Sequence, residues 1–209
     1  MFNKLYEIID GVIHQKICNK IEYNVNYIND RYVKYGILSD EMSFLRLGFI
    51  LGGVKEEIRS ILDIGYGNGA FLRVANNLIP NCYGNDISGF PLPENVIFVD
   101  NIFNNSYDVI TLFDVLEHFE NIEFVKDLKC KYICLTVPWC HFFSEDWFMN
   151  WKHRRYDEHL WHFNSDSLDH FMQNMGFIRI SNHSNLEDSI RKTDFNYPNI
   201  LTCLYKKIN

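Results

Sequence analysis

The 209 residues include 20 Lys and Arg against 27 Asp and Glu, a formal net charge of −7, and 47% of them are hydrophobic. This composition excludes a disordered polar chain and indicates one globular domain, because a chain of this length can bury a sizeable core. The acidic balance disfavours nucleic acid and membrane as partners, which leaves a small molecule as the expected partner.

Six cysteines without a Cys-x-x-Cys pair predict reduced thiols in a cytoplasmic protein. No stretch predicts a membrane span or a removable targeting segment. Nothing in the pattern assigns an oligomeric state.

The first 58 residues predict a helical N-terminal cap, because Leu5, Ile8, Ile9, Val12 and Ile13 recur at the spacing of one helix face. The remaining residues, 59–209, form a second region in which short apolar runs alternate with helical patterns. The expected strands cover 60–64, 81–85, 96–99, 107–113 and 132–137, and the expected helices cover 70–79 and 115–128. This alternation predicts a doubly wound, mostly parallel α/β sheet.

The C-terminal part of this region continues the sheet. An irregular insert at 138–163 precedes a helix over 165–175, which Gly176 ends. Strands over 177–181 and 200–206 follow, separated by a polar loop over 182–198. The sheet is therefore expected to have seven strands.

Three glycines stand on the turn from the first strand into a helix. Gly65, Gly67 and Gly69 permit positive φ and let a ligand approach the backbone closely. Asp86, at the end of the next strand, is placed to accept the two hydroxyls of an adenosine ribose. Asp63, just before the glycines, would repel a pyrophosphate but attract an ammonium group. These features predict S-adenosyl-L-methionine as the cofactor in preference to NAD.

The segments LDIGYGNGAFL, YGNDIS, VIFVDNIF, YDVITLFDVLEHFE and YICLTVPW resemble the class I (Rossmann-like) S-adenosylmethionine-dependent methyltransferases. The resemblance extends over residues 60–206 and implies the fold of that family. One departure is that residues 87–95 leave no room for the usual crossover helix between the second and third strands. The implied cofactor-binding residues are Asp63, Gly65, Tyr66, Gly67, Gly69, Asp86, Ile87, Asp100, Asn101, Ile102, Phe113, Asp114 and Val115.

The sequence FDVLEHF supplies candidate catalytic groups. Asp114, Glu117 and His118 have the i, i+3, i+4 spacing of one helix face, and Asp114 could alternatively cap that helix. His118 could act as a general base, because imidazole titrates near neutral pH. We take His118, Glu117 and His162 as the candidate catalytic residues.

A metal site is an alternative interpretation of the same segment. Glu117 and His118, with His159 or His162, resemble part of the metal site of small-RNA 2′-O-methyltransferases and ubiquinone-pathway O-methyltransferases, whose helix carries Glu-x-x-Glu-His. Here the first acid is the shorter Asp114. The expectation adopted from the sequence is a site without a metal.

The 138–163 insert follows the fifth strand and is rich in rings and cations. Aromatic rings can stack on sugars, and arginines can bind phosphate or carboxylate. The predicted function is therefore methyl transfer to the oxygen or nitrogen of a small molecule, with a sugar or nucleotide-sugar as the first candidate. The alternatives are a metal-dependent RNA 2′-O-methyltransferase-like enzyme and a non-catalytic, cofactor-binding regulatory protein. The candidate acceptor-binding residues are Trp139, His141, Trp147, Arg154, Arg155 and Tyr32.

Overall fold

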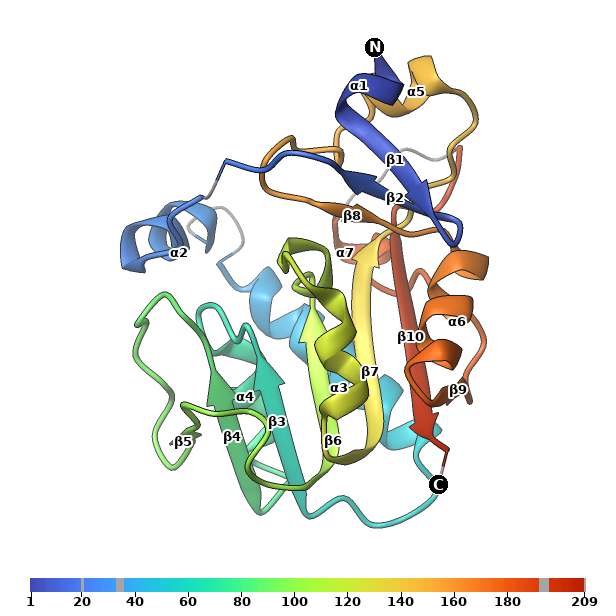
Figure 1. Cartoon of the computed structure of the whole chain (residues 1–209). Helices are drawn as coiled ribbons and strands as arrows, with labels where there is room; N and C mark the ends of the chain where they lie inside the picture. Colours follow the sequence, from blue (N-terminus) through green and yellow to red (C-terminus); the bar gives the residue numbers. More distant parts are fainter. Residues whose placement is uncertain (20, 33–35, 192–195, 209) are drawn as a thin grey trace.

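The computed structural model describes residues 1–19, 21–32, 36–191 and 196–208 (Figure 1). A seven-stranded sheet forms its centre, with the strand order β5-β4-β3-β6-β7-β10-β9. The first five strands of that order are parallel, β10 runs antiparallel to β7, and β9 runs antiparallel to β10. The predicted mostly parallel seven-stranded sheet is confirmed. Its strands are β3 (Ser60–Ile64), β4 (Asn81–Asn85), β5 (Ile97–Phe98), β6 (Tyr107–Phe113), β7 (Cys130–Pro138), β9 (Phe177–Arg179) and β10 (Ile200–Lys207).

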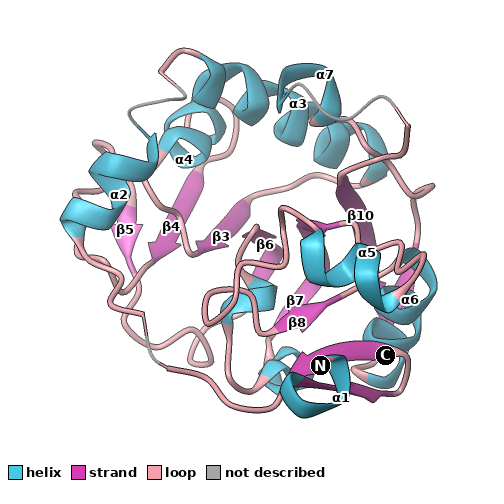
Figure 2. Cartoon of the chain, turned by 90° about the horizontal axis from the view of Figure 1, so that it is seen from above, coloured by secondary structure: helices cyan, strands magenta, loops and turns pink. Residues whose placement is uncertain are grey.

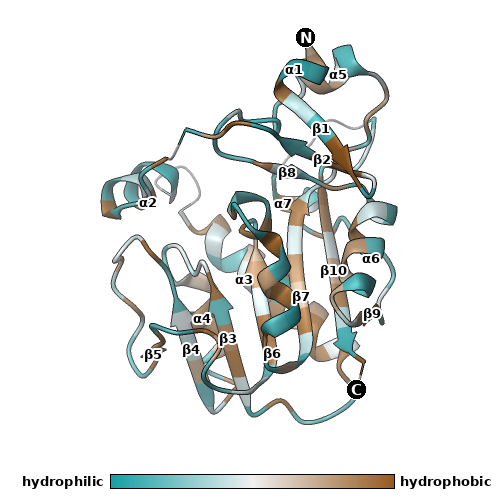
Figure 3. Ribbon diagram, in the orientation of Figure 1, coloured by the Kyte–Doolittle hydropathy of each residue, from teal (hydrophilic) through white to brown (hydrophobic). Residues whose placement is uncertain are grey.

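Helices cover both faces of this sheet, as Figure 2 shows from above. α3 (Leu38–Gly53) and α4 (Ala70–Ala75) lie on one face, and α6 (Ser165–Asn174) lies on the other. Along β6, Val109 and Phe113 pack in the core shared with α3 and α4, whereas Ile110 and Leu112 pack in the core shared with α6. Successive side chains of a strand point to opposite faces of the sheet, so a strand this apolar must be covered by helices on both faces. Figure 3 shows hydrophobic residues concentrated along the central strands.

The strand order reverses between β3 and β6. The chain continues from β3 to β4 on one side and later returns to form β6 on the other side of β3. In open α/β sheets, ligands bind at such a reversal, outside the carboxyl ends of the strands. Residues 86–96, between β4 and β5, contain no helix, which confirms the predicted loss of the crossover helix.

The N-terminal region mixes helix and strand, so the prediction of a wholly helical cap over residues 1–58 is wrong. β1 (Tyr6–Ile9) and β2 (Val12–Gln15) form an antiparallel hairpin. Asp10 and Gly11 make its two-residue turn, with φ of 49° and 83°. Positive φ at both positions matches the twist of a hairpin, and Asp-Gly adopts it readily. Among the described residues of this region, helix is confined to α1 (Phe2–Leu5), α2 (Val25–Tyr32) and α3.

A small second sheet covers the carboxyl ends of the main sheet (Figure 1). β2 pairs with β8 (Trp161–His162), which gives the order β1-β2-β8. The aromatic side chains of Phe2, Tyr6, Phe148 and Trp151 are buried together beside this sheet, where α1 and α5 (Glu145–Asn150) pack. Residues 1–16 and 139–163 therefore form one unit, which we call the lid.

The segment after β6 does not form the α-helix predicted for residues 115–128. It contains two 3₁₀ turns, η1 (Leu116–His118) and η2 (Ile122–Asp127). Asp114 has a φ of 57° and caps neither turn. A positive φ is costly for a residue with a Cβ and persists only where the surrounding contacts hold it. The helical spacing argument for this segment therefore fails, although its side chains still reach the site described below.

Two other predicted boundaries also change. α4 ends at Ala75 and not at residue 79, and the polar stretch 182–198 contains a one-turn helix, α7 (Asp188–Arg191). The side chain of Glu187, which precedes α7, is fully buried. Within the described residues, none of the helices has the length and apolar character needed to cross a membrane.

Candidate functional site

A cavity of about 230 Å³ lies at the carboxyl ends of β3, β4 and β6 and reaches side chains of α2 and α3. It therefore occupies the point where the strand order reverses. The lining residues are Tyr23, Tyr27, Ile28, Arg31, Tyr32, Met42, Arg46, Ile64, Gly65, Gly67, Asn85, Asp86, Ile87, Phe113, Asp114, Val115, His118, Phe119 and Arg191.

The turn after β3 forms part of the cavity wall. Gly65, Gly67 and Gly69 have φ values of 72°, 56° and 71°, a region that favours glycine. The Asp86 carboxylate accepts hydrogen bonds from the backbone N–H of Gly67 at 2.8 Å and of Ser88 at 2.7 Å. One side chain at the end of β4 therefore fixes the glycine turn and its own loop beside the cavity.

Replacing Gly65 by alanine is expected to lower the free energy of unfolding by about 2–4 kcal/mol. The backbone at residue 65 has positive φ, and a Cβ there would overlap the side chain of Val115. Gly48→Ala is the matched control, because Gly48 is an exposed residue inside α3 with open space around its Cβ position. Alanine there should raise stability by about 1 kcal/mol. Urea denaturation measures the change in the free energy of unfolding for both variants. Equal changes in Gly65→Ala and Gly48→Ala would contradict the proposed strain at residue 65.

Asp63 is buried beneath the glycine turn. Its Oδ1 accepts a hydrogen bond from the Thr111 hydroxyl at 2.6 Å. It lines a smaller cavity that shares Gly65 and Phe113 with the larger one. Burial raises the pKa of Asp63 to about 7, although Thr111 and Arg46 act in the opposite direction. A cationic group beside Asp63 would therefore favour its charged form.

Two arginines and two acids form a buried ion network at the cavity wall, which joins α3, the end of β6 and α7. The Nε atom of Arg46 lies 2.5 Å from Oε1 of Glu187, and its Nη2 lies 3.4 Å from Oδ2 of Asp114. Arg191 pairs with both acids as well. The Arg46 guanidinium also lies over the Phe113 ring, 4.3 Å from its centroid. Burial would raise the pKa of Asp114, but the charges of the two arginines outweigh it and lower that pKa.

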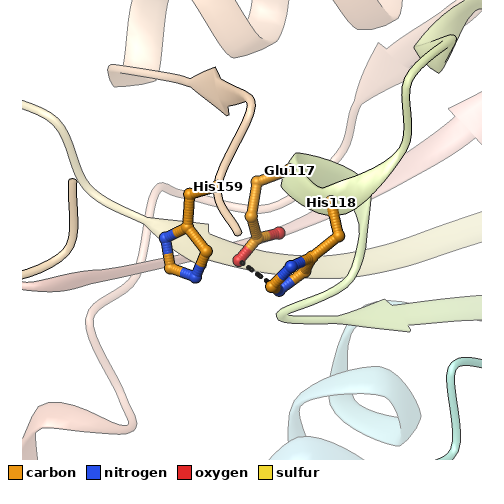
Figure 4. Close-up of side chains that lie close together, drawn as sticks. All are labelled: Glu117, His118 and His159. Atoms are coloured by element: carbon orange, nitrogen blue, oxygen red, sulfur yellow. Dashed lines mark ion pairs between the residues drawn. The ribbon is translucent and has the colours of Figure 1, made fainter. Parts of the chain in front are cut away.

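A carboxylate and two imidazoles meet where η1 contacts the lid (Figure 4). Glu117 is 0% exposed, and ligand atoms of Glu117, His118 and His159 all lie within 4.8 Å of one another. The backbone N–H of Leu160 donates to the carbonyl oxygen of Glu117 at 2.8 Å, which holds the lid against η1. Burial raises the pKa of Glu117 and lowers that of His118 to about 4, so it favours the neutral form of both.

Three tyrosines from α2 and the residues before it reach the cavity. The hydroxyl of Tyr23 lies 3.0 Å from Nδ1 of His118, and the hydroxyl of Tyr27 donates to Glu158 at 2.8 Å. Tyr32 lies against the glycine turn. Burial raises the pKa of Tyr27 and of Tyr32 to about 12 and raises that of Tyr23 further, so all three remain neutral phenols.

The structure brings most of the predicted cofactor residues together. Asp63 and Tyr66 line the smaller cavity, and Gly69 is the N-cap residue of α4. The predicted residues that line the larger cavity are Tyr32, Gly65, Gly67, Asp86, Ile87, Phe113, Asp114, Val115 and His118. Asp100, Asn101 and Ile102, which follow β5, line neither cavity.

Of the aromatic residues predicted to bind the acceptor, Tyr32 lines the cavity, whereas Trp139, His141 and Trp147 lie within the lid. Trp139 stacks on His141, and Trp147 contacts His141 edge-on, so these rings pack on one another and do not line the cavity. His162 is buried inside the lid against Phe148, and burial lowers its pKa to about 3. His159, three positions earlier, is the histidine that faces η1.

The predicted basic residues of the lid also have internal partners. Arg154 donates to the hydroxyl of Tyr6 at 3.2 Å, and Arg155 lies 2.6 Å from the Glu158 carboxylate. Neither lines the cavity. The two arginines therefore hold parts of the lid together through these contacts.

Sequence reasoning missed several residues of the site. Tyr23 and Met42 line the cavity, and Arg191 and Glu187 complete the ion network. The i, i+4 spacing of Glu187 and Arg191 was an available signal for an ion pair on one helical turn.

Comparisons with known proteins agree on the fold. A family model described as a methyltransferase domain matches residues 38–181. The putative methyltransferase in a complex with the Haloferax volcanii Trm112 methyltransferase activator is 11% identical, with a TM-score of 0.63 over 91% of this chain and 100% of that one. No curated protein matches the sequence.

Two further solved structures have the same fold. An S-adenosylmethionine-dependent methyltransferase from Clostridium acetobutylicum is 10% identical, with a TM-score of 0.61 over 88% of this chain and 98% of that one. The 1,6-didemethyltoxoflavin-N1-methyltransferase of Burkholderia thailandensis, solved with bound 1,6-didemethyltoxoflavin and S-adenosylhomocysteine, is 12% identical, with a TM-score of 0.57 over 98% of this chain and 99% of that one. These likenesses confirm the Rossmann-like methyltransferase fold that the sequence predicted.

Proposed function

Because this chain belongs to the methyltransferase-domain family, we propose that it methylates an oxygen or nitrogen atom of a small-molecule acceptor. It is an enzyme whose methyl donor is S-adenosyl-L-methionine, which supplies a methyl group on a positively charged sulfonium. The observation that carries the proposal is the cavity at the strand-order reversal, walled by the glycine turn and Asp86. A role as a non-catalytic regulator is therefore set aside.

The residues around the turn fit this cofactor. Gly65 and Gly67 line the cavity with backbone that carries no Cβ, and Asp86 has the half-buried carboxylate that a ribose diol requires. Asp63 lies beneath the turn, where its carboxylate would attract the ammonium group of a methionine moiety. Val115 lies against Gly65 and would border the sulfonium end.

Binding of S-adenosylhomocysteine, the demethylated cofactor, is expected to strengthen about tenfold between pH 6 and pH 8. The pKa of Asp63 is raised to about 7, so the residue is neutral below that pH and charged above it. Only the charged form attracts an ammonium, so affinity rises as the pH rises through 7. Asp63→Asn should bind weakly with a flat profile. Isothermal titration calorimetry measures both proteins, and a flat wild-type profile would contradict the assignment.

The side of the cavity away from the glycine turn is the proposed acceptor site. It presents Tyr23, Tyr27 and Phe119, whose rings suit a flat or cyclic acceptor, together with His118. Burial favours neutral His118, which can accept a proton from an acceptor hydroxyl or amine. His162 is not carried forward as a catalytic residue, because it is enclosed in the lid. The six free cysteines support a cytoplasmic location.

A panel assay tests the proposed activity. The purified chain is incubated with S-adenosylmethionine and separate sugars, nucleotide-sugars, phenols, amines and short RNA, and release of S-adenosylhomocysteine is measured. Turnover with a small molecule supports the proposal, and turnover with RNA alone would contradict it. The net charge of −7 makes RNA the least favoured of these acceptors. Absence of S-adenosylhomocysteine binding would overturn the cofactor assignment itself.

A further inference from the structure

Both carboxylate oxygens of Glu117 are buried, and neither accepts a hydrogen bond from any of the described residues. Buried polar atoms in folded proteins are nearly always satisfied, so such a carboxylate indicates a missing partner, such as water or an ion. The side chains gathered around it are His118 and His159. From this arrangement we propose that Glu117, His118 and His159 bind one divalent transition-metal ion (Figure 4).

The two histidines are oriented as metal ligands are. Nδ1 of His159 lies 2.7 Å from the carbonyl oxygen of His153. A carbonyl only accepts hydrogen bonds, so Nδ1 carries the proton and Nε2 of the neutral ring keeps a lone pair. Nδ1 of His118 is likewise held by the Tyr23 hydroxyl, and its Nε2 lies 3.9 Å from Oε1 of Glu117. Anchoring of the second ring nitrogen is what orients metal-binding histidines.

The spacing of the cluster is close to that of a loaded site. Ligand atoms about 2.1 Å from one ion lie about 3.4 Å from each other in a tetrahedral arrangement. The observed atoms lie within 4.8 Å of one another, so side-chain rotations that shorten the distances by up to about 1.4 Å would close the site. Glu117 and His118 are adjacent on η1, and the hydrogen bond from Leu160 fixes His159 opposite them.

The donor set indicates which ion binds. Asp114 is engaged by Arg46 and Arg191, so it does not join the cluster. Two imidazoles and one carboxylate remain, a set that suits Zn²⁺ or Fe²⁺ and not Mg²⁺, which prefers oxygen ligands and water. This differs from the site without a metal that the sequence led us to expect.

The position of the cluster also indicates a use. His118 lines the large cavity, so the ion would lie at its edge. The ion would occupy the Nε2 lone pair of His118, so in the metal-bound protein the ion would replace this imidazole in acting on the acceptor. Three protein ligands leave coordination positions open, where an oxygen atom of the acceptor could bind and become more acidic. The inference goes beyond the proposed function, because ion binding can be measured without any methyl acceptor.

Titration of the chelator-treated, full-length protein with Zn²⁺ tests the site. Calorimetry should show one strong Zn²⁺ site per chain and no comparable binding of Mg²⁺. Glu117→Gln and His159→Ala should each weaken Zn²⁺ binding by about 100-fold or more, and Tyr23→Phe by about 10-fold. Glu117→Gln keeps the shape of the side chain, so folding should be retained, as circular dichroism would check.

Glu7→Gln is the matched control, because Glu7 also lies beside a histidine, 3.1 Å from His14, but on the exposed hairpin. Its Zn²⁺ affinity should equal that of the wild type. The proposal would be overturned if Glu117→Gln and His159→Ala bound Zn²⁺ as tightly as the wild type does. It would also be overturned if the wild type did not bind one Zn²⁺ per chain. S-adenosylhomocysteine binding is measured on the same samples. A wild-type protein that binds S-adenosylhomocysteine but not Zn²⁺ rejects only the metal site, whereas one that binds Zn²⁺ but not S-adenosylhomocysteine rejects only the proposed function.

Discussion

Arg46→Ala is expected to lower the free energy of unfolding by about 3–5 kcal/mol, the cost of breaking a buried ion pair by removing one partner. The variant leaves Glu187, which is 0% exposed, with one fewer cationic partner, and it removes a contact to Asp114. It also uncovers one face of the Phe113 ring. Urea denaturation followed by circular dichroism measures the loss.

Two further variants separate this cost from a general effect of removing an arginine. Arg73→Ala breaks an ion pair with Asp40 that is exposed on the surface, and it should cost less than about 1 kcal/mol. In the double variant Arg46→Met, Glu187→Gln, both charges are removed, so part of the loss should be recovered. A single-variant loss no larger than that of Arg73→Ala would contradict the role of the network.

Asp86→Ala is expected to weaken S-adenosylhomocysteine binding by about 100-fold, as the loss of hydrogen bonds to a charged group predicts. The carboxylate holds the N–H of Gly67 and of Ser88, and its side chain faces the cavity. The variant therefore loses the proposed ribose contact and relaxes the turn that shapes the site. Calorimetry at one fixed pH measures the change.

The controls for this prediction distinguish local from general effects. Asp127→Ala removes an exposed carboxylate at the end of η2 and should leave the affinity unchanged. Asp86→Asn retains one acceptor oxygen and should give an intermediate loss. Asp100→Ala tests a residue on which the sequence resemblance and the structure differ. The resemblance implies that Asp100 borders the adenine, so its loss would weaken binding. The structure places Asp100 outside both cavities, so its loss would leave binding unchanged. Unaltered binding in Asp86→Ala would reject this residue as a cofactor contact.

The first strands of the central sheet could be predicted because β3 and β6 are apolar at most positions and β3, β4 and β6 are followed directly by Gly65, Asp86 and Asp114. The bounds of β3, β4 and β6 agree with the prediction residue for residue. The N-terminal error has a physical reason, since the apolar spacing of residues 5–13 fits a helix face as well as two short strands. The Asp10-Gly11 pair was the signal that should have decided between them.

The sequence predicted the part of the candidate site that lies on neighbouring strands. It did not predict the parts that come together from distant segments. The glycine turn and Asp86 belong to two neighbouring parallel strands, so their proximity follows from the fold. Arg46 and Glu187 meet only through the packing of α3 against α7, which no local pattern reports. The choice between His159 and His162 depends on how β8 sits in the lid, which the sequence of the insert did not specify.

The pairing of the N-terminal hairpin with β8 has a consequence for the order in which the protein assembles. Gln15 donates to Asp157, a residue 142 positions later, and β2 has no sheet partner other than its own hairpin until β8 has been made. During synthesis on the ribosome, β1 and β2 therefore cannot pair with β8 until the chain that forms β3 to β7 has been made. Contacts of such long range are entropically expensive to close. Closure over the carboxyl ends is thus expected to be a late event in folding, after the central strands have paired.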